Sequence, residues 1–165
     1  MLKPGGLLAV WQTAKWMPFF GGWYGQDFRV FIACKSYVQL YDVPMNFAYD
    51  PIVCVWKPGA RPLVPSSPGR THDYFVSDMK FDALARQHPC PRPLDLCEHF
   101  VRNFTVEGGY VLDAFAGSGT IPLAVERVGG GRSWLAIEKD ATYCKLMRRR
   151  LREGQGRPAR QSTCK

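Results

Sequence analysis

The spacing of apolar and polar residues differs between the two halves of the chain. In the first half, short apolar runs predict strands at Leu7–Gln12, Phe28–Cys34 and Pro51–Trp56, because turn-forming residues separate them. A loop joins the second and third runs, so we expect these two to form an antiparallel pair. The aromatic, glycine-broken stretch Trp16–Tyr24 supports no assignment beyond one or two helical turns.

The second half alternates between helical and strand periodicity. A helix is expected from Arg92 or Pro93 onward, since apolar residues recur there at spacings of three and four. The strand Tyr110–Phe115 follows, then a glycine turn and a second helix. The strand Ser133–Glu138 leads into a last helix with Asp140 as its cap. This alternation of helices and strands predicts an α/β fold with a parallel sheet.

Composition places the chain among ordinary globular proteins. Of its 165 residues, 46% are hydrophobic and 22% are charged. No apolar run is long enough to span a membrane, and the N-terminus lacks the layout of a signal peptide. We therefore expect a cytoplasmic protein without a membrane partner. The six cysteines form no Cys-x-x-Cys pair, which favours reduced thiols.

The net charge of +8 belongs almost entirely to the C-terminus. Between Lys145 and Lys165 there are eight basic residues and one acid, Glu153. The other 144 residues hold 14 basic and 13 acidic side chains, a net charge of +1. Two interpretations stay open: a solvated helix end with a disordered tail, or a patch that binds phosphate groups.

The stretch from Asp113 to Thr120 carries the clearest chemical signal. A strand delivers an acid at its end, and Gly117 and Gly119 then allow the backbone to approach a ligand and to expose amides at a helix N-terminus. Ligands of open α/β sheets bind at this edge. Glu138 follows the next strand, 21 residues beyond Gly117, where an acid can accept hydrogen bonds from both hydroxyls of a ribose.

Other binding motifs fit this stretch less well. The dinucleotide fingerprint requires a small residue where this sequence has Pro122, which disfavours an NAD-dependent oxidoreductase. No Gly-Lys-Ser/Thr follows, so it is not a P-loop. A purely structural glycine turn does not account for the acids on both sides. We expect no metal, since the candidate zinc ligands lack the usual paired spacing; they are His88, Cys90, Cys97 and His99.

Four segments of the chain resemble the DNA amino-methyltransferases (adenine-N6 and cytosine-N4) with permuted motif order. Along the sequence they occur in the order that this family has. Asp113-Ala-Phe-Ala-Gly-Ser-Gly-Thr120 is similar to their AdoMet-binding motif. Leu2–Val10 is similar to the strand that follows the family's catalytic segment. His88–Leu94 is similar to the family's His-Pro-x-x-Lys-Pro segment, with Arg92 in place of lysine. Ala136–Cys144 is similar to the family's Gly-x-Glu…Tyr ending.

The resemblance implies a Rossmann-like AdoMet-dependent methyltransferase fold. It also implies methyl transfer from AdoMet to N6 of adenine or N4 of cytosine in DNA, as in restriction-modification. Asp113 would serve the methionine end of the cofactor and Glu138 its ribose, while the segment 88–93 closes over it. The implied cofactor-binding residues are Asp113, Ala114, Phe115, Gly117, Ser118, Gly119, Thr120 and Glu138.

The family's catalytic tetrapeptide, (Asp/Ser/Asn)-Pro-Pro-(Tyr/Phe/Trp), does not occur in this sequence. The nearest match, Tyr49-Asp-Pro-Ile52, has a single proline and leads into a strand. We therefore expect an incomplete fold without its central catalytic strand, no catalytic residue and no transfer by this chain alone. A missing N-terminal segment or a partner chain would supply the motif. The alternative is an inactive fragment or subunit that binds AdoMet or DNA.

A cytosine-C5 type of chemistry is a further alternative, because Pro89-Cys90 resembles the nucleophile of those enzymes. Their nucleophile follows the cofactor motif, whereas Cys90 precedes it, so we expect Cys90 to pack at a helix entry.

By resemblance the chain divides into four segments. These are 1–57, the C-terminal part of a catalytic subdomain; 58–87, a Pro-rich loop and candidate target-recognition region; 88–153, the AdoMet-binding subdomain; and 154–165, a basic disordered tail.

Overall fold

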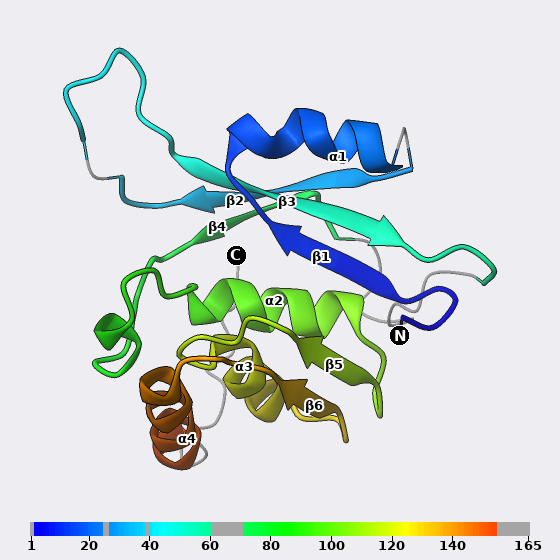
Figure 1. Ribbon diagram of the computed structural model, residues 1–165, viewed down its shortest axis with the longest axis vertical. Coiled ribbons are helices and arrows are strands. Elements are labelled where there is room, and N and C mark those ends of the chain that lie inside the picture. The colour runs from blue at the N-terminus through cyan, green and yellow to red at the C-terminus, as the bar shows by residue number, and fades with distance from the viewer. Residues whose placement is uncertain (1, 25–26, 39, 61–70, 155–165) are drawn as a thin grey trace. The chain divides into compact units, whose positions relative to one another are not determined.

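The computed structural model divides the chain into an N-terminal unit, Met1–Met79, and a C-terminal unit, Lys80–Lys165 (Figure 1). The residues described are 2–24, 27–38, 40–60 and 71–154. The basic tail beyond 154 and most of the Pro-rich stretch, at 61–70, therefore lie outside the described residues. Within the described part, no helix is both long and apolar enough to cross a membrane.

The N-terminal unit contains a four-stranded sheet of order β1-β3-β2-β4. Strand β3 pairs antiparallel with both β1 and β2, and β4 pairs parallel with β2. The first three strands and the antiparallel β2–β3 pair confirm the predictions from sequence. The fourth strand was not predicted, since it has four residues and lies in the segment assigned to a loop. The strands are β1 Leu7–Trp11, β2 Arg29–Lys35, β3 Tyr49–Trp56 and β4 Tyr74–Ser77.

The core of this unit forms around β3, its central strand. Ile52 and Val53 are successive residues and point to opposite faces of the sheet, yet both are fully buried. Both faces are therefore covered at this strand. Helix α1, Met17–Tyr24, lies over one of them (Figure 1) and buries Phe20. Burial also raises the pKa of the Cys54 thiol to about 12, so this cysteine is a core residue.

The C-terminal unit has the predicted alternation of helices and strands. Its two strands pair parallel, from Tyr110 opposite Ser133 to Asp113 opposite Ala136. Both strands end two residues before their predicted ends, because the chain turns away at Asp113 and Ala136. The elements are α2 Leu94–Phe104, β5 Tyr110–Asp113, α3 Thr120–Val128, β6 Ser133–Ala136 and α4 Ala141–Gly154.

One face of the β5–β6 pair forms the core of this unit with the three helices. Val111 and Trp134 point to this face, and the residues of α2 and α3 that pack with them are Cys97, Val101, Ala124 and Val125. Helix α4 packs on α3 through Met147 and Leu151, which contact Leu123. Because side chains alternate along a strand, the opposite face carries Leu112 and Leu135, which are exposed.

Asp140 caps α4, as predicted. Its Oδ1 accepts hydrogen bonds from the backbone amides of Thr142 and Tyr143, at 2.7 and 3.2 Å. These two bonds hold the pKa of Asp140 below its ordinary value. The start of α4, the helix that follows Glu138, is therefore fixed by a local contact, which the sequence pattern could reveal.

Replacement of Leu123 by alanine should lower the free energy of unfolding by about 2–4 kcal/mol, since it removes a side chain that is 1% exposed and leaves a cavity between α3 and α4. Urea denaturation followed by circular dichroism measures the change. The matched control is Leu112→Ala, at a leucine that is 55% exposed, with an expected loss below about 1 kcal/mol. Equal losses in the two variants would contradict the assigned core.

Candidate functional site

The candidate site lies at the carboxyl ends of β5 and β6. The Ile137 amide donates to the Asp113 carbonyl at 2.8 Å, and the Ala116 amide donates to the Ile137 carbonyl at 3.0 Å. The chain thus leaves both strands side by side. Asp113 and Glu138, which are 25 positions apart in the printed sequence, consequently lie at one edge of the sheet, on either side of the turn 114–119.

Two positions of this turn require glycine. Gly117 has φ +51° and Gly119 has φ +77°, in the left-handed region that residues with a Cβ rarely adopt. Space is short at both positions as well. A Cβ on Gly117 would lie 2.9 Å from Nε2 of His88, and one on Gly119 would overlap the Met147 side chain. The turn is therefore enclosed by His88 on one side and by α4 on another.

Several amides of the turn already have partners inside the protein. The Phe115 amide donates to Asp113 Oδ1 at 3.2 Å, and the Gly117 amide donates to Glu138 Oε2 at 2.7 Å. The Gly119 amide donates to the Ala116 carbonyl at 2.8 Å. The prediction that the turn exposes its amides to a ligand is wrong for these three donors. Two of them are occupied by the acids before and after the turn, and the third is occupied by a carbonyl of the turn itself.

Glu138 joins the turn to the start of α4. Its Oε2 accepts from the Gly117 amide, and its Oε1 accepts from the Asp140 amide at 2.9 Å. These backbone hydrogen bonds lower the pKa of the Glu138 carboxyl, the bond from Asp140 most of all. Each carboxylate oxygen can accept more than one hydrogen bond. The side chain is thus held in one place, ionised, with acceptor capacity left for hydroxyl groups of a ligand.

Asp113 has the opposite shift. Burial raises the pKa of its carboxyl, the Phe115 amide partly offsets this, and the negative charge of Glu138 raises it further. A half-buried carboxyl beside a second acid is destabilised in its ionised form. A positively charged ligand group next to Asp113 would relieve that destabilisation. The site therefore suits a ligand that brings both a cation and hydroxyl groups.

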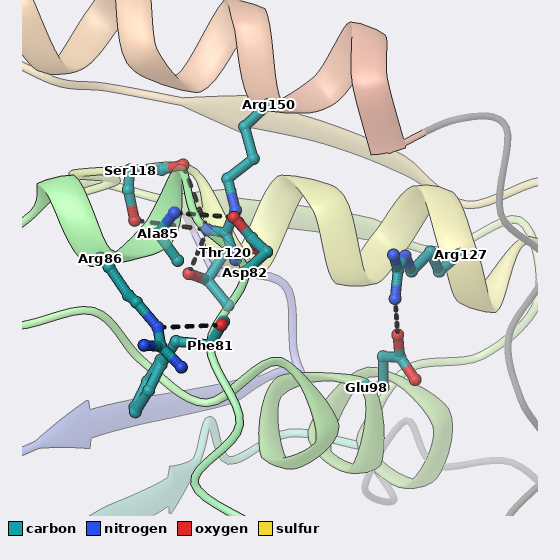
Figure 2. A network of polar contacts seen from close by, with 9 residues as sticks. All are labelled: Phe81, Asp82, Ala85, Arg86, Glu98, Ser118, Thr120, Arg127 and Arg150. Atoms are coloured by element: carbon teal, nitrogen blue, oxygen red, sulfur yellow. Dashed lines mark hydrogen bonds and ion pairs between the residues drawn. The ribbon is translucent and has the colours of Figure 1, made fainter.

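The remaining predicted residues fall into two groups. Ala114 and Phe115 point outward, and Phe115 is 92% exposed, so its ring is free to contact a ligand. Ser118 and Thr120 are buried, and their hydroxyls accept hydrogen bonds from the Arg150 guanidinium at 3.3 and 2.7 Å. Figure 2 shows these two side chains gathered around Arg150. Direct contact of their hydroxyls with a ligand is thereby disfavoured.

His88 lies beside the turn, where the resemblance places its segment. Its ring packs on Tyr143 with a centroid separation of 4.5 Å, and its Nδ1 accepts a hydrogen bond from the Cys90 amide at 3.2 Å. When the ring is neutral, the proton consequently resides on Nε2, the atom nearest to Gly117. Cys90 itself is exposed, so the expectation that it packs at the helix entry is wrong, and Cys97 lies in the core. Among the described residues, no cluster of His, Cys, Asp or Glu is arranged to hold a metal ion.

The glycine turn gives a test of its close packing. Gly119→Ala should destabilise the protein by about 2–4 kcal/mol, because left-handed backbone strain adds to a collision with Met147. Gly108→Ala is the matched control: its φ is +67°, but nothing lies within 4 Å of the added Cβ. It should cost only about 1–2 kcal/mol. Thermal unfolding measures both. On a Met147→Ala background the Gly119→Ala cost should fall toward that of the control, because Cγ and Sδ are removed and only the Cβ contact at 3.1 Å remains, and an unchanged cost would exclude the collision.

Comparison with solved structures confirms the α/β Rossmann-like fold. The M1.HpyAVI–SAM complex has a TM-score of 0.78 and 18% sequence identity, and the match covers 90% of this chain and 76% of that one. The cytosine-N4-specific PvuII DNA methyltransferase has a TM-score of 0.69 and 16% identity, with 94% and 71% covered. At such identities the likeness establishes the fold.

Two curated relatives of this chain are type II methyltransferases. The type II methyltransferase M2.DpnII of Streptococcus pneumoniae is 38% identical over 72 residues, which are 44% of this chain and 26% of that protein. M2.LlaDCHI of Lactococcus lactis subsp. cremoris is 33% identical over 75 residues, 46% and 27% of the two chains. The matched stretch thus spans about a quarter of each relative.

The model of the N6/N4 methyltransferase family, whose description is DNA methylase, matches residues 14–149. The match includes most of both units and the whole glycine turn, together with Asp113, Glu138 and His88. It agrees with the resemblance inferred from the four sequence segments. The chain belongs to the DNA methylase family.

Proposed function

We propose that this chain binds AdoMet at the glycine turn and acts in the transfer of its methyl group to DNA. The acceptor is an exocyclic amino nitrogen, N6 of adenine or N4 of cytosine. The observation that carries this proposal is the placement of Asp113 and Glu138 on either side of the turn, at the ends of two adjacent parallel strands. Family membership supports the same chemistry.

The residues of the site fit AdoMet. The ionised, fixed Glu138 carboxylate suits the ribose diol. Asp113, whose pKa is raised by burial, suits the positively charged methionine end. Gly117 and Gly119 allow close backbone approach, and the exposed Phe115 ring offers an apolar face. When bound, AdoMet supplies an electrophilic methyl group on its sulfonium.

DNA as the substrate is supported by the charge distribution on α4. Its side chains Lys145, Arg148, Arg149 and Arg152 are exposed, at spacings of three and four that place them along one side of the helix. Arg149 forms a 2.8 Å ion pair with Glu153, whose carboxylate partly offsets the positive charge at that position. Arg150 points inward and is 3% exposed. The outward cations are available to phosphate groups, so the phosphate-binding interpretation of the basic C-terminus extends to this helix.

A second candidate function is binding of AdoMet or DNA without turnover. It is favoured by the absence of the (Asp/Ser/Asn)-Pro-Pro-(Tyr/Phe/Trp) tetrapeptide from the 165 residues. An exocyclic amine is a weak nucleophile, and the tetrapeptide would supply acceptors for its hydrogens and an aromatic face for the flipped base. A polypeptide that carries this motif would then be required for transfer.

Calorimetry and a transfer assay distinguish these functions. We expect the full chain to bind AdoMet and its demethylated product with micromolar affinity, and to bind NAD at least about tenfold more weakly. Tritiated AdoMet and unmethylated DNA then test transfer, with and without a polypeptide that supplies the Asp-Pro-Pro-Tyr segment. Label in DNA, identified as N6-methyladenine or N4-methylcytosine, supports the transferase. Cofactor binding without label in either assay supports the second candidate, and preference for NAD overturns both.

Asp113→Asn should raise stability at neutral pH and weaken AdoMet binding by about tenfold or more. The raised pKa of Asp113 means that its ionisation opposes folding above that pKa, and asparagine removes this cost while it still accepts from the Phe115 amide. The gain in melting temperature should shrink as the pH falls from the folded pKa toward the unfolded one, and it should vanish below the unfolded pKa, where the wild-type carboxyl is protonated in both states.

The matched control for this variant is Asp140→Asn. The pKa of Asp140 is lowered, so its ionised form stabilises the fold and the variant should lose stability at neutral pH. Its cap on α4 remains possible with asparagine, and AdoMet affinity should stay within about twofold of wild type. A lower melting temperature for Asp113→Asn than for wild type at pH 7 would contradict the assigned shift.

A further inference from the structure

Arg150 is a buried cation, and each of its three guanidinium nitrogens has an acceptor in the C-terminal unit. Its Nε donates to Asp82 Oδ2 at 2.9 Å, and its Nη2 lies 2.8 Å from the same oxygen in an ion pair. Its Nη1 donates to the Ser118 carbonyl and hydroxyl, both at 3.3 Å, and to the Thr120 hydroxyl at 2.7 Å. The guanidinium therefore connects three parts of the unit: α4, which carries it; the segment that contains Asp82; and the junction of the glycine turn with α3 (Figure 2).

A buried guanidinium is costly unless its charge and its donors are matched. Arg150 is 3% exposed, and Asp82 provides the opposite charge, while the pKa of the Asp82 carboxyl is held below its ordinary value by the Ala85 amide and by Arg150. The planar guanidinium presents five donors in a rigid fork, whereas the lysine ammonium is a compact charge with three donors, so lysine would not reproduce this geometry. The arrangement fixes the distance between Asp82 and the turn.

Asp82 extends this connection toward His88. Its Oδ1 accepts from the Ala85 amide at 2.7 Å, at the start of the 3₁₀ helix Ala85–Gln87. That helix is followed directly by His88, whose Nε2 lies against Gly117. Arg150 therefore contacts one wall of the proposed cofactor site, the turn, and is linked through Asp82 to the segment that forms the other.

We propose that Arg150 and Asp82 are positioning residues for the cofactor site, which together set the separation between the glycine turn and His88. This inference rests on the proposed function, since it assumes that AdoMet binds at the turn. Neither residue contacts the ligand in this scheme. They act through Ser118, Thr120 and the 3₁₀ helix, and their loss would widen the space in which AdoMet is held.

The chain offers a matched control in a second ion pair of the same unit. Arg127 of α3 donates to Glu98 of α2 at 3.5 Å, and Figure 2 shows this pair apart from the group around Arg150. Both pairs join an arginine to an acid on another segment, and both arginines are mostly buried. Only the Arg150 pair touches the glycine turn.

The test compares Arg150→Lys and Asp82→Asn with Arg127→Met. In the first two, we expect AdoMet affinity to fall by about tenfold or more when calorimetry is done well below the melting temperature. Asp82→Asn is the milder change, because Asp82 is partly exposed and asparagine can still accept from Ala85, so it provides a folded variant if Arg150→Lys does not fold. Arg127→Met should stay within about twofold of wild type.

Hydrogen exchange gives a readout that a general loss of stability would not produce. In Arg150→Lys and Asp82→Asn, exchange should accelerate in peptides that cover 81–90 and 114–121, and not in those that cover 97–104. In Arg127→Met, exchange should accelerate in peptides that cover 97–104 and not in those that cover 81–90 and 114–121. If wild type binds no AdoMet, the proposed function fails, while the exchange pattern still tests the coupling. If wild type binds and both variants bind within twofold of it, the positioning role is overturned and the proposed function stands.

Discussion

The parallel pairing of β5 with β6 is the constraint on which the candidate site depends. Two main-chain hydrogen bonds, from Ile137 to Asp113 and from Ala116 to Ile137, hold the chain beyond both strands in register. A shift of one residue would move Asp113 to the other face of the sheet and separate it from Glu138. Strand pairing thus determines which two acids flank the turn, before any side chain contributes.

The local parts of this arrangement could be predicted from sequence, and the long-range parts could not. The spacing of Asp113, the two glycines and Glu138 within a strand–turn–helix pattern predicts their roles. The place of Asp140 before a helix predicts that it caps the helix. Arg150 did not stand out, because it lies in a run of three arginines and its partners are 32 and 68 residues away. Helical periodicity gave one signal: Arg150 lies three residues after the buried Met147 and is therefore on the same side of α4.

Two other differences have related causes. Strand β4 has four residues and depends on parallel pairing with β2, which no local pattern reveals. The amides of the turn were expected to be free, since a glycine-rich helix N-terminus usually offers them to ligands. Glu138 occupies one of them from 21 residues away. In this protein the ionised acid both organises the turn and presents acceptors, so the shape of the turn matters more than its donors.

The pairing of Asp82 with Arg150 also bears on cooperativity. The two residues lie near opposite ends of the described part of the C-terminal unit, so their contact closes a loop that contains α2, β5, α3 and β6. The contact therefore joins the start of the unit to its last helix. Local opening of α4, or of the segment around Asp82, breaks the contact and removes the support that Arg150 gives to the glycine turn. Ligand binding at the turn is thereby linked to local opening at both ends of the unit, so occupancy of the site and the stability of these two segments depend on each other.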